Sequence, residues 1–352
     1  MGRKRRLVLS ALAAVGVIVA GAAPAGAIVN GTPAKRSQYP FFAVIGSGCG
    51  GALVTPSRVL TAAHCTEALL HTDRVSVGPR GELRRVRLRA MLPLHVRELA
   101  KMEREFPPPA GDLMLLQLNR PVRDVPFARI ATATEGLTAA GTTVTTIGRG
   151  ASASDGSGQG VFRSGAVTLQ PPSSCAEELG TQLLRRWSLC ARDQRQLDRA
   201  DPGPFVSACV GDSGSPLLAG PATEPRVIGV VSWGPSCGEQ RDPEIYANAV
   251  AGRAFALARN PAWAPQAAGS PRVVGTPRVG RTVRCAVRWR VRPTRRLVYS
   301  FYLDRIQVQS GPGPTRRLRA SDRGGRVSCD AQGETAGGRG GTETLAPPRL
   351  VR

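Results

Sequence analysis

The sequence predicts an all-β fold, because short apolar stretches alternate with turn-forming residues along most of the chain. Residues 28–263 contain many such stretches, separated by Gly, Pro, Ser and Thr. Closely spaced apolar stretches with turn residues between them favour a β-barrel or a β-sandwich. Eight cysteines, an even number, are typical of an exported and oxidised protein. The clearest expected strands are residues 41–45, 51–54, 113–118, 142–147 and 227–232.

The end of this β unit is marked by a change in composition. Residues 250–259 are rich in Ala and predict a terminal helix, and residues 264–270 read as a linker. Residues 271–352 hold 18 Arg, no Lys and 5 acidic residues, so they carry +13 of the total formal charge of +23. We therefore expect a second, basic domain over 271–352. Its expected strands are residues 282–290, 297–303 and 326–329.

The first residues indicate export. A positive cluster from Arg3 to Arg6 precedes an apolar run over 7–23, and Ala25-Gly26-Ala27 forms a small-residue cleavage site. This pattern predicts a signal peptide over residues 1–27 and a secreted protein. An uncleaved membrane anchor is the alternative, since the run approaches spanning length. The pattern does not decide between general and twin-arginine export. No later stretch is apolar enough to span, so we expect no membrane contact after cleavage.

Ser213 is the candidate nucleophile. It lies in Gly211-Asp212-Ser213-Gly214. A serine hydroxyl attacks a carbonyl efficiently only when a base takes its proton and nearby donors stabilise the resulting oxyanion. Glycine on both sides lets the backbone turn sharply and point N–H groups into a cleft. A coincidental turn would give the same residues.

A candidate base and a candidate acid lie upstream. His64 precedes Cys65, and a neutral imidazole accepts a proton near pH 7 and returns it to the leaving group. His71 and His95, the other two histidines, lie among charged or loop residues and are expected at the surface. Asp112 stands directly before an apolar strand, where it fits the role of orienting the histidine. A turn aspartate that starts a strand is the alternative.

Together these segments resemble the chymotrypsin–trypsin family. The order His64, Asp112, Ser213 agrees, as do the flanking TAAHC, GDLMLLQL and GDSGSP. Residues 231–234 (VSWG) are similar to the family's substrate-binding strand. The resemblance spans residues 28–263. It implies two six-stranded antiparallel β-barrels with a catalytic triad at their junction, in a serine endopeptidase that forms an acyl-enzyme.

The resemblance also implies roles for further residues. The backbone N–H groups of Gly211 and Ser213 would form the oxyanion hole. Ser232 would support Asp112, and the backbone from Ser232 through Trp233 to Gly234 would pair with the substrate as an added strand. The implied disulfides are Cys49–Cys65, Cys175–Cys190 and Cys209–Cys237.

Two features bear on packing and on metals. The family's usual Gly-Trp-Gly reads Gly148-Arg149-Gly150 here, and this departure does not touch the triad. Residues 73–82 offer few acids for the family's calcium loop, and no CxxC pair suggests zinc. We therefore expect no metal and no cofactor.

Ile28 resembles the mature N-terminus of these proteases. In the family, the freed α-ammonium inserts and pairs with the acid before the nucleophile, here Asp212. Ala27 directly precedes Ile28, without the usual basic pro-segment. We expect signal peptidase itself to release the active enzyme.

The specificity pocket gives two indications. Ser207, six positions before Ser213, stands where the resemblance predicts a pocket base for large apolar or aromatic side chains. Glu244 replaces the glycine that usually leaves the pocket open. Facing the pocket, its carboxylate would meet Lys or Arg and give dual specificity, as in similar granule proteases. Alternatively, the side chain swings to solvent.

Residues 271–352 resemble the small Ig-like modules of actinobacterial extracellular proteins, with Cys285 and Cys329 placed for an inter-sheet disulfide of a β-sandwich. The basic face fits anionic cell-wall polymers or acts as a solvated spacer, and it carries no nucleic-acid motif. We expect a monomer that acts on proteins or peptides. The alternative is a protease-like binding protein or adhesin without activity, which a complete triad disfavours.

Overall fold

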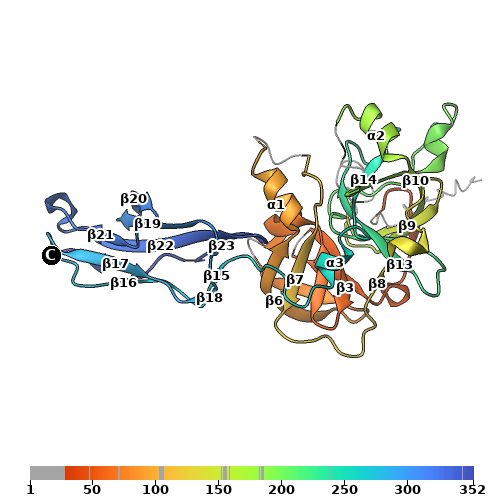
Figure 1. Ribbon diagram of the computed structural model, residues 1–352. Coiled ribbons are helices and arrows are strands. Elements are labelled where there is room, and N and C mark those ends of the chain that lie inside the picture. The colour runs from red at the N-terminus through yellow and green to blue at the C-terminus, as the bar shows by residue number, and fades with distance from the viewer. Residues whose placement is uncertain are drawn as a thin grey trace, which may run out of the picture.

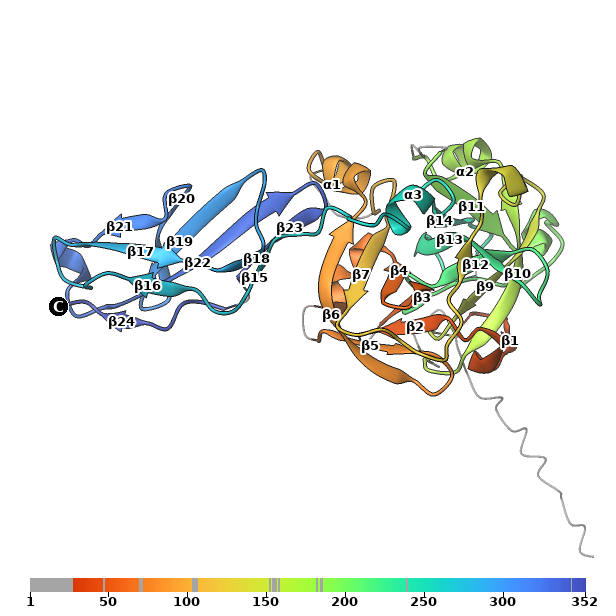
Figure 2. The same cartoon turned by 60° about the horizontal axis from the view of Figure 1, so that its bottom comes forward.

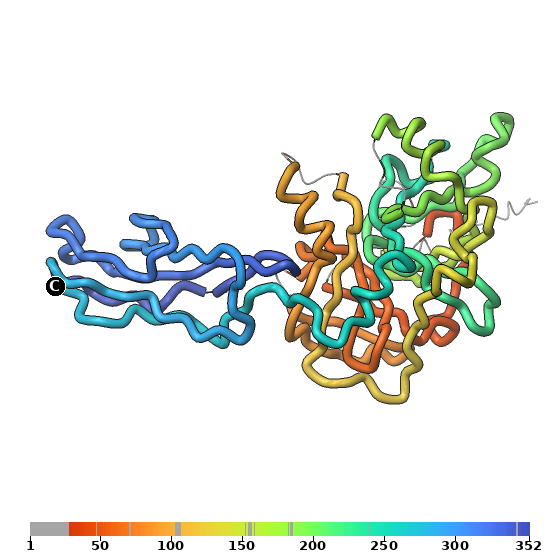
Figure 3. Tube along the Cα trace, viewed as in Figure 1, coloured from red at the N-terminus to blue at the C-terminus, as the bar shows by residue number. Residues whose placement is uncertain are grey.

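The computed structural model describes residues 28–352 except 47, 70–71, 103–106, 152, 154–156, 158, 182, 184–185, 239 and 343. The expected signal peptide over 1–27 and His71 therefore lie outside the described residues. Among the described residues, no helix has both the length and the apolarity that a membrane span requires. The tube in Figure 3 shows two barrels side by side and an elongated C-terminal part that ends far from them.

Six strands close the first barrel in the order β2-β3-β4-β7-β6-β5. Its centre is filled by side chains such as Leu53, Val59 and Leu116, which share one face of the sheet and none of which is exposed. On β6, the exposed Leu83, Arg85 and Arg87 alternate with less exposed residues, as expected of a strand with one face toward solvent. The strands are β2 (Phe42–Ile45), β3 (Cys49–Thr55), β4 (Arg58–Thr61), β5 (Arg74–Val77), β6 (Glu82–Met91) and β7 (Met114–Leu118).

The second barrel is also closed by six strands, because β9 pairs with both β12 and β10 at the ends of the path β10-β11-β14-β13-β12. Ile28, Leu217 and Tyr246 fill its centre. Two short strands, β1 (Thr32–Pro33) and β8 (Arg129–Ile130), flank this barrel. The barrel strands are β9 (Thr143–Gly148), β10 (Arg163–Gln170), β11 (Ser188–Arg192), β12 (Pro216–Ala219), β13 (Arg226–Trp233) and β14 (Glu244–Asn248).

The C-terminal part consists of two sheets that the Cys285–Cys329 disulfide joins. Val283, Phe301 and Val327 pack between the sheets. The larger sheet has the order β18-β15-β23-β22-β19-β20 with β24 on β22, and the smaller has the order β16-β17-β21. The strands are β15 (Gln266–Ala267), β16 (Arg272–Val274), β17 (Thr282–Ala286), β18 (Trp289–Val291), β19 (Leu297–Leu303), β20 (Ile306–Gly311), β21 (Thr315–Arg317), β22 (Arg326–Thr335), β23 (Gly338–Gly341) and β24 (Arg349–Leu350).

This architecture confirms the predicted all-β fold of two six-stranded antiparallel barrels followed by a small β-sandwich. The resemblance of that sandwich to Ig-like modules stays a prediction. Gln266 and Ala267, within the expected linker, form β15 and pair with β18 and β23. The domain boundaries themselves stay predictions.

Helices are few and short in the described part of the chain. The predicted terminal helix over 250–259 is present but reduced to α3, and the side chain of Arg58 binds the carbonyls of Ala258 and Arg259 just beyond it. The α-helices are α1 (Pro93–Leu99), α2 (Pro172–Glu178) and α3 (Arg253–Ala256); the 3₁₀ helices are η1 (Arg36–Gln38), η2 (Ala63–Leu69), η3 (Ala133–Glu135), η4 (Gln194–Leu197) and η5 (Ala320–Asp322).

The first barrel lies between the second barrel and the C-terminal sheets, as Figures 1 and 2 show from two directions. In both views β23 reaches the side of the first barrel where β6 and α1 lie. The main cleft opens at the junction of the barrels, because its lining comes from η2, α1 and β13 together.

Candidate functional site

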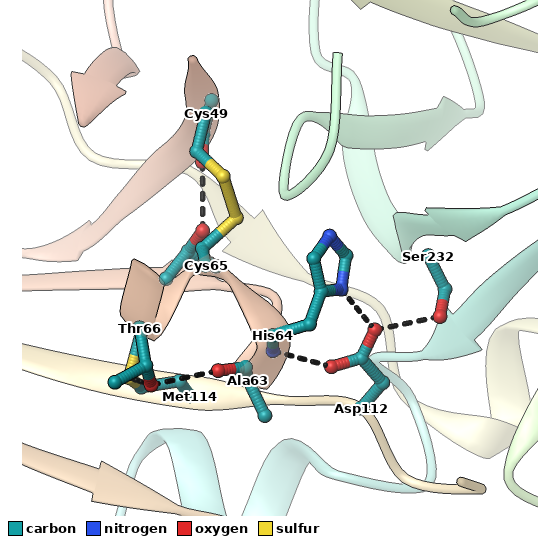
Figure 4. Close-up of a disulfide and its surroundings, with 10 residues drawn as sticks. Cys49, Ala63, His64, Cys65, Thr66, Asp112, Met114 and Ser232 are labelled. Carbon is teal, nitrogen blue, oxygen red and sulfur yellow. Dashed lines mark hydrogen bonds and ion pairs between the residues drawn. A yellow bond between two sulfur atoms is a disulfide. The ribbon is translucent and has the colours of Figure 1, made fainter. Parts of the chain in front are cut away.

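His64 and Asp112 form a hydrogen-bonded pair beside the Cys49–Cys65 disulfide (Figure 4). The Nδ1 atom of His64 lies 2.7 Å from Oδ2 of Asp112, and the His64 backbone N–H donates to Oδ1 at 3.0 Å. Ser232 donates its hydroxyl to Oδ2 at 2.6 Å. The carboxylate is thus held at both oxygens, which fixes the plane of the imidazole ring and its tautomer.

The local sequence explains why these groups meet. His64 follows β4 on the short helix η2, and the disulfide to β3 holds that helix in place. Asp112 lies two residues before Met114, the first residue of β7, which pairs with β4, so the ends of the two strands bring acid and base together. The sulfur atoms of Cys49 and Cys65 lie close to His64, but both belong to the disulfide and offer no thiolate for a metal.

His64 and Ser213 line the same cleft, which has a volume of about 680 Å³. Ser213 comes from the second barrel and His64 from the first, so the cleft brings together residues far apart in the chain. The backbone carbonyl of Ser213 accepts a hydrogen bond from Gly50 of β3 at 2.7 Å. This contact holds the serine loop against the barrel that carries the histidine.

The loop before Ser213 turns sharply at Gly211. Gly211 has a φ of +92°, a region open to glycine and strained for other residues. The N–H groups of Asp212, Gly214 and Ser215 donate to backbone carbonyls. No carbonyl of a described residue accepts from Gly211 or Ser213. These two N–H groups match the pair expected to bind an oxyanion.

The pair of His64 and Asp112 is electrostatically matched. Burial lowers the pKa of His64, but the hydrogen bond and charge of Asp112 outweigh it, so the His64 pKa is raised above its ordinary value. Burial raises the pKa of Asp112, but the hydrogen bond and charge of His64 outweigh it and hold that pKa low. Asp112 is therefore ionised when His64 takes up a proton.

Ile28 is fully buried and reaches the carboxylate of Asp212. Its backbone N–H donates to Asp212, as do those of Gly150 at 2.7 Å and Cys209 at 3.0 Å. Burial nevertheless raises the pKa of Asp212 to about 6, despite these bonds. The structure brings together the two residues of the expected activation pair.

The glycines of Gly148-Arg149-Gly150 are needed for close approach to Asp212. A Cβ atom at Gly148 would lie 1.9 Å from Oδ1 of Asp212, and one at Gly150 would lie 2.6 Å from its backbone nitrogen. The side chain of Arg149 points elsewhere and donates to the carbonyl of Gly160 at 2.9 Å. The departure from Gly-Trp-Gly therefore leaves the triad untouched, as expected.

Glu244 lines the cleft and is 6% exposed, so the alternative in which it swings to solvent does not occur. The Tyr246 hydroxyl and the Ala208 N–H donate hydrogen bonds to its carboxylate. The Ser207 hydroxyl lies beside the carboxylate and donates to the carbonyl of Ala208 at 2.9 Å. Burial raises the pKa of Glu244 to about 7, against the lowering effect of these bonds. Trp233 and Gly234 line the same end of the cleft, as the resemblance implied. Ser207 is buried directly behind it.

The expectation that His95 is a surface residue is wrong. It is 3% exposed, its Nδ1 lies 3.1 Å from the carbonyl of Pro109, and it lines the cleft. Residues 93–99 form a helix that Pro93 starts, and this helix turns His95 inward. Met91, Leu99 and Pro109 also line this wall of the cleft, which sequence reasoning missed. The only signal was the apolar spacing of Leu92, Leu94, Val96 and Leu99 around the histidine.

The eight cysteines form four disulfides, with no free cysteine among the described residues. These are the pairings that the resemblance and the sandwich prediction implied: Cys49–Cys65, Cys175–Cys190, Cys209–Cys237 and Cys285–Cys329.

Comparison with known proteins places this geometry among relatives. Residues 28–252 match the protein family described as Trypsin. Serine protease 56 of mouse (Mus musculus) is 34% identical over 237 residues, which are 63% of this chain but only 36% of the mouse protein. The match to its human counterpart also spans 36% of that protein.

Two relatives are covered over most of their length. A trypsin-like protease of Streptomyces glaucescens is 28% identical over 248 residues, which are 67% of this chain and 86% of the relative. Human kallikrein-7 is 30% identical over 234 residues, which are 62% of this chain and 81% of the relative. All of these matches leave part of this chain uncovered.

Proposed function

Because this chain belongs to the trypsin family of serine proteases, we propose that it is a secreted endopeptidase that cleaves peptide bonds with Ser213, His64 and Asp112. The observation that carries the proposal is the paired His64 and Asp112 in one cleft with Ser213. Four disulfides support secretion, since such bonds persist in oxidising compartments.

The geometry supports a two-step reaction. The Oγ atom of Ser213 attacks the substrate carbonyl while His64 takes the hydroxyl proton, and the N–H groups of Gly211 and Ser213 bind the oxyanion. His64 then protonates the leaving amine, which departs and leaves an acyl-enzyme. Water repeats the sequence, with His64 as base, and releases the acid. Asp112 stays ionised and stabilises the imidazolium in both steps.

Cleavage before Ile28 would complete this site. The peptide N–H of Ile28 already reaches Asp212, and a free α-ammonium at that place would give the buried carboxylate a counter-charge. Ile28 has a φ of +57°, which a β-branched residue adopts only at a cost when a residue precedes it. We infer that signal peptidase cleavage after Ala27 generates the active form.

The cleft supports dual specificity. When Glu244 is ionised, its carboxylate can pair with a Lys or Arg side chain of the substrate. When Glu244 is protonated, the bottom of the pocket is uncharged and can accept an aromatic side chain. A pKa of about 7 keeps both forms populated near neutral pH. We expect chromogenic peptides ending in Phe, Leu, Lys or Arg to be hydrolysed, and fluorophosphonate to block all of them. A chain starting at Ile28 that hydrolyses none and takes up no fluorophosphonate would instead be a binding protein or adhesin.

The variant Glu244→Gly tests the pocket base. Loss of a hydrogen bond to a charged group costs about 1.5–3 kcal/mol, so kcat/KM for the Lys and Arg peptides should fall about 10–100-fold. The Phe peptide should lose less. Glu224→Gly is the matched control, because that acid is exposed and remote from the cleft. If wild type does not hydrolyse the Lys and Arg peptides, and the Glu244→Gly substitution does not change this, then Glu244 has no role in binding substrate in the pocket.

We further propose that residues 271–352 retain the protein on anionic cell-wall polymers, on the strength of their formal charge of +13. Such attraction is screened by salt. Retention on isolated walls should therefore fall as salt rises, and it should be lost when residues 271–352 are deleted. Retention that neither change affects would leave this part a spacer.

A further inference from the structure

We propose that the C-terminal sandwich acts as a buttress for one wall of the catalytic cleft, and so contributes to the binding of extended peptides. The element responsible is the turn between β22 and β23, residues 335–338, which we call the docking turn. It inserts between the chain leaving α3 and the end of β6, and Figures 1 and 2 show β23 at that side of the first barrel. The inference rests on the proposed endopeptidase function.

Backbone hydrogen bonds fix the docking turn to β6. The Met91 N–H donates to the carbonyl of Gly337 at 2.9 Å. Thr335 donates its hydroxyl to the carbonyl of Trp263 at 2.8 Å, and the Ala264 N–H donates to the carbonyl of Arg89 at 2.8 Å. The first barrel and the C-terminal sandwich are thus held together by hydrogen bonds as well as by the chain that connects them. We call this contact region the seam.

The seam is closely packed. A Cβ atom at Gly337 would lie 1.5 Å from the backbone oxygen of Ala262 and 3.4 Å from Cβ of Ala90. The guanidinium of Arg58 lies 5.6 Å from the centre of the Trp263 ring and donates to the carbonyl of Arg259 at 2.9 Å. The segment between barrel and sandwich is therefore held against β4 as well as β6.

Met91 connects this seam to the cleft. It is the last residue of β6, it lines the cleft, and its sulfur would lie 3.7 Å from a Cβ atom at Gly338. The next residue, Leu92, donates its N–H to the carbonyl of Leu113, next to Asp112. Helix α1 follows and adds His95 and Leu99 to the same wall. A shift of the docking turn would thus move the start of this wall.

The wall faces substrate outside the Glu244 end of the cleft. Glu244 enters the cleft from β14 of the second barrel, while Met91 and Leu99 enter it from β6 and α1, on the side of the first barrel. A peptide whose scissile residue enters the Glu244 end would bring its preceding residues to this wall. Because most of the wall is apolar, it suits an apolar side chain there.

The test compares a single-residue ester with a tetrapeptide amide that shares its scissile residue and carries an apolar residue before it. In Gly337→Ala, kcat/KM for the tetrapeptide should fall about tenfold, mainly through KM, because misplacement of a binding wall by a fraction of an ångström is costly. The ester should change by less than about twofold. Gly313→Ala is the matched control, because no atom lies within 4 Å of its added Cβ, and it should change neither.

Two measurements separate docking from misfolding. Fluorophosphonate titration measures the fraction of molecules whose Ser213 is reactive. Misfolding lowers this fraction, so it lowers the ester and tetrapeptide rates equally and leaves their ratio unchanged. Thr335→Val adds no volume but removes two hydrogen bonds, the one donated to the carbonyl of Trp263 and the one that the Gly337 N–H donates to the hydroxyl. It should shift the ratio in the same direction. In a Met91→Ala background the effect of Gly337→Ala should disappear if coupling passes through Met91.

The outcomes are distinct. An unchanged ratio of tetrapeptide to ester rates in both Gly337→Ala and Thr335→Val, with wild type active, overturns the buttress and leaves the endopeptidase function intact. A wild-type chain starting at Ile28 that neither titrates nor hydrolyses either substrate overturns the proposed function, and the buttress with it.

Discussion

Replacing Asp112 by Asn is expected to lower kcat by about 10⁴-fold while leaving the fold intact. The carboxylate accepts bonds from His64 Nδ1, the His64 backbone N–H and Ser232. An amide keeps the volume but presents an N–H group to one of these donors. The ring then loses the acceptor that selects its tautomer, and the imidazolium loses its stabilising charge. Single-turnover kinetics with a chromogenic peptide would measure the loss.

The pH profile gives a second reading of the same change. Activity needs neutral His64, so wild-type activity should fall as the pH drops through the raised pKa of that residue. Because Asp112 supplies the effects that raise this pKa, the acid limb of Asp112→Asn should move to lower pH. A merely structural defect would lower the whole profile without moving its limb.

Two further variants give the lower and upper limits of activity against which Asp112→Asn is compared. Ser213→Ala defines the rate without a nucleophile. Asp73→Asn changes an exposed acid in the same barrel, 3.6 Å from Arg85, and should keep wild-type activity. If Asp112→Asn behaves like Asp73→Asn, the proposed triad is wrong.

The two barrels could be predicted from the sequence because the patterns that indicate them are local. Alternating or continuous apolar stretches predict strands, and the flanks of His64, Asp112 and Ser213 carry the resemblance that implies how those strands close. Leu297–Leu303 has the bounds expected from its sequence. By contrast, β15 and β24 contain two residues each, and two residues show no period.

The missed wall of the cleft has a different cause. The charged residues Arg97 and Glu98 lie close to His95 in sequence, but the environment of His95 is set by the carbonyl of Pro109, fourteen residues away, and by the packing of α1. Likewise, nothing near Gly337 in the sequence shows that its carbonyl binds Met91. Long-range contacts of this kind depend on how the domains dock, and one sequence gives no periodic signal for docking.

The second large effect is expected from the N-terminus. A chain that starts at Ile28 should have a kcat/KM about 10²–10³-fold above one with a single Gly added before Ile28. The added residue leaves the buried Asp212 without a counter-charge, and breaking a buried pair in this way costs about 3–5 kcal/mol. Both chains can be prepared by specific proteolysis of a fusion and compared on one peptide. A Gly added after Arg352 serves as the matched extension and should have no effect.

The stability of the two chains should fall with rising pH over different pH ranges. Pairing raises the pKa of the α-amine above its ordinary value of about 8, so this stabilisation is complete below that value and is lost as pH rises through the raised pKa. In the extended chain the added Gly carries the ammonium, so Ile28 offers only a peptide N–H to Asp212, whose pKa burial raises to about 6. A raised carboxyl pKa stabilises the protonated form, so that chain loses stability as pH rises through about 6. The difference in melting temperature should therefore widen between about pH 4, near the ordinary pKa of an aspartate, and about pH 6.

Asp212→Asn decides whether the buried carboxylate is the cause. An uncharged amide does not form an ion pair with an ammonium, so the substitution should bring the Ile28-start and Gly-extended chains to similar activity. It should also remove the increase with pH in the difference between their melting temperatures. Persistence of the full difference in Asp212→Asn would show that the free N-terminus acts through another contact. Equal activity of the two chains with Asp212 intact would show that processing before Ile28 is not what completes the site.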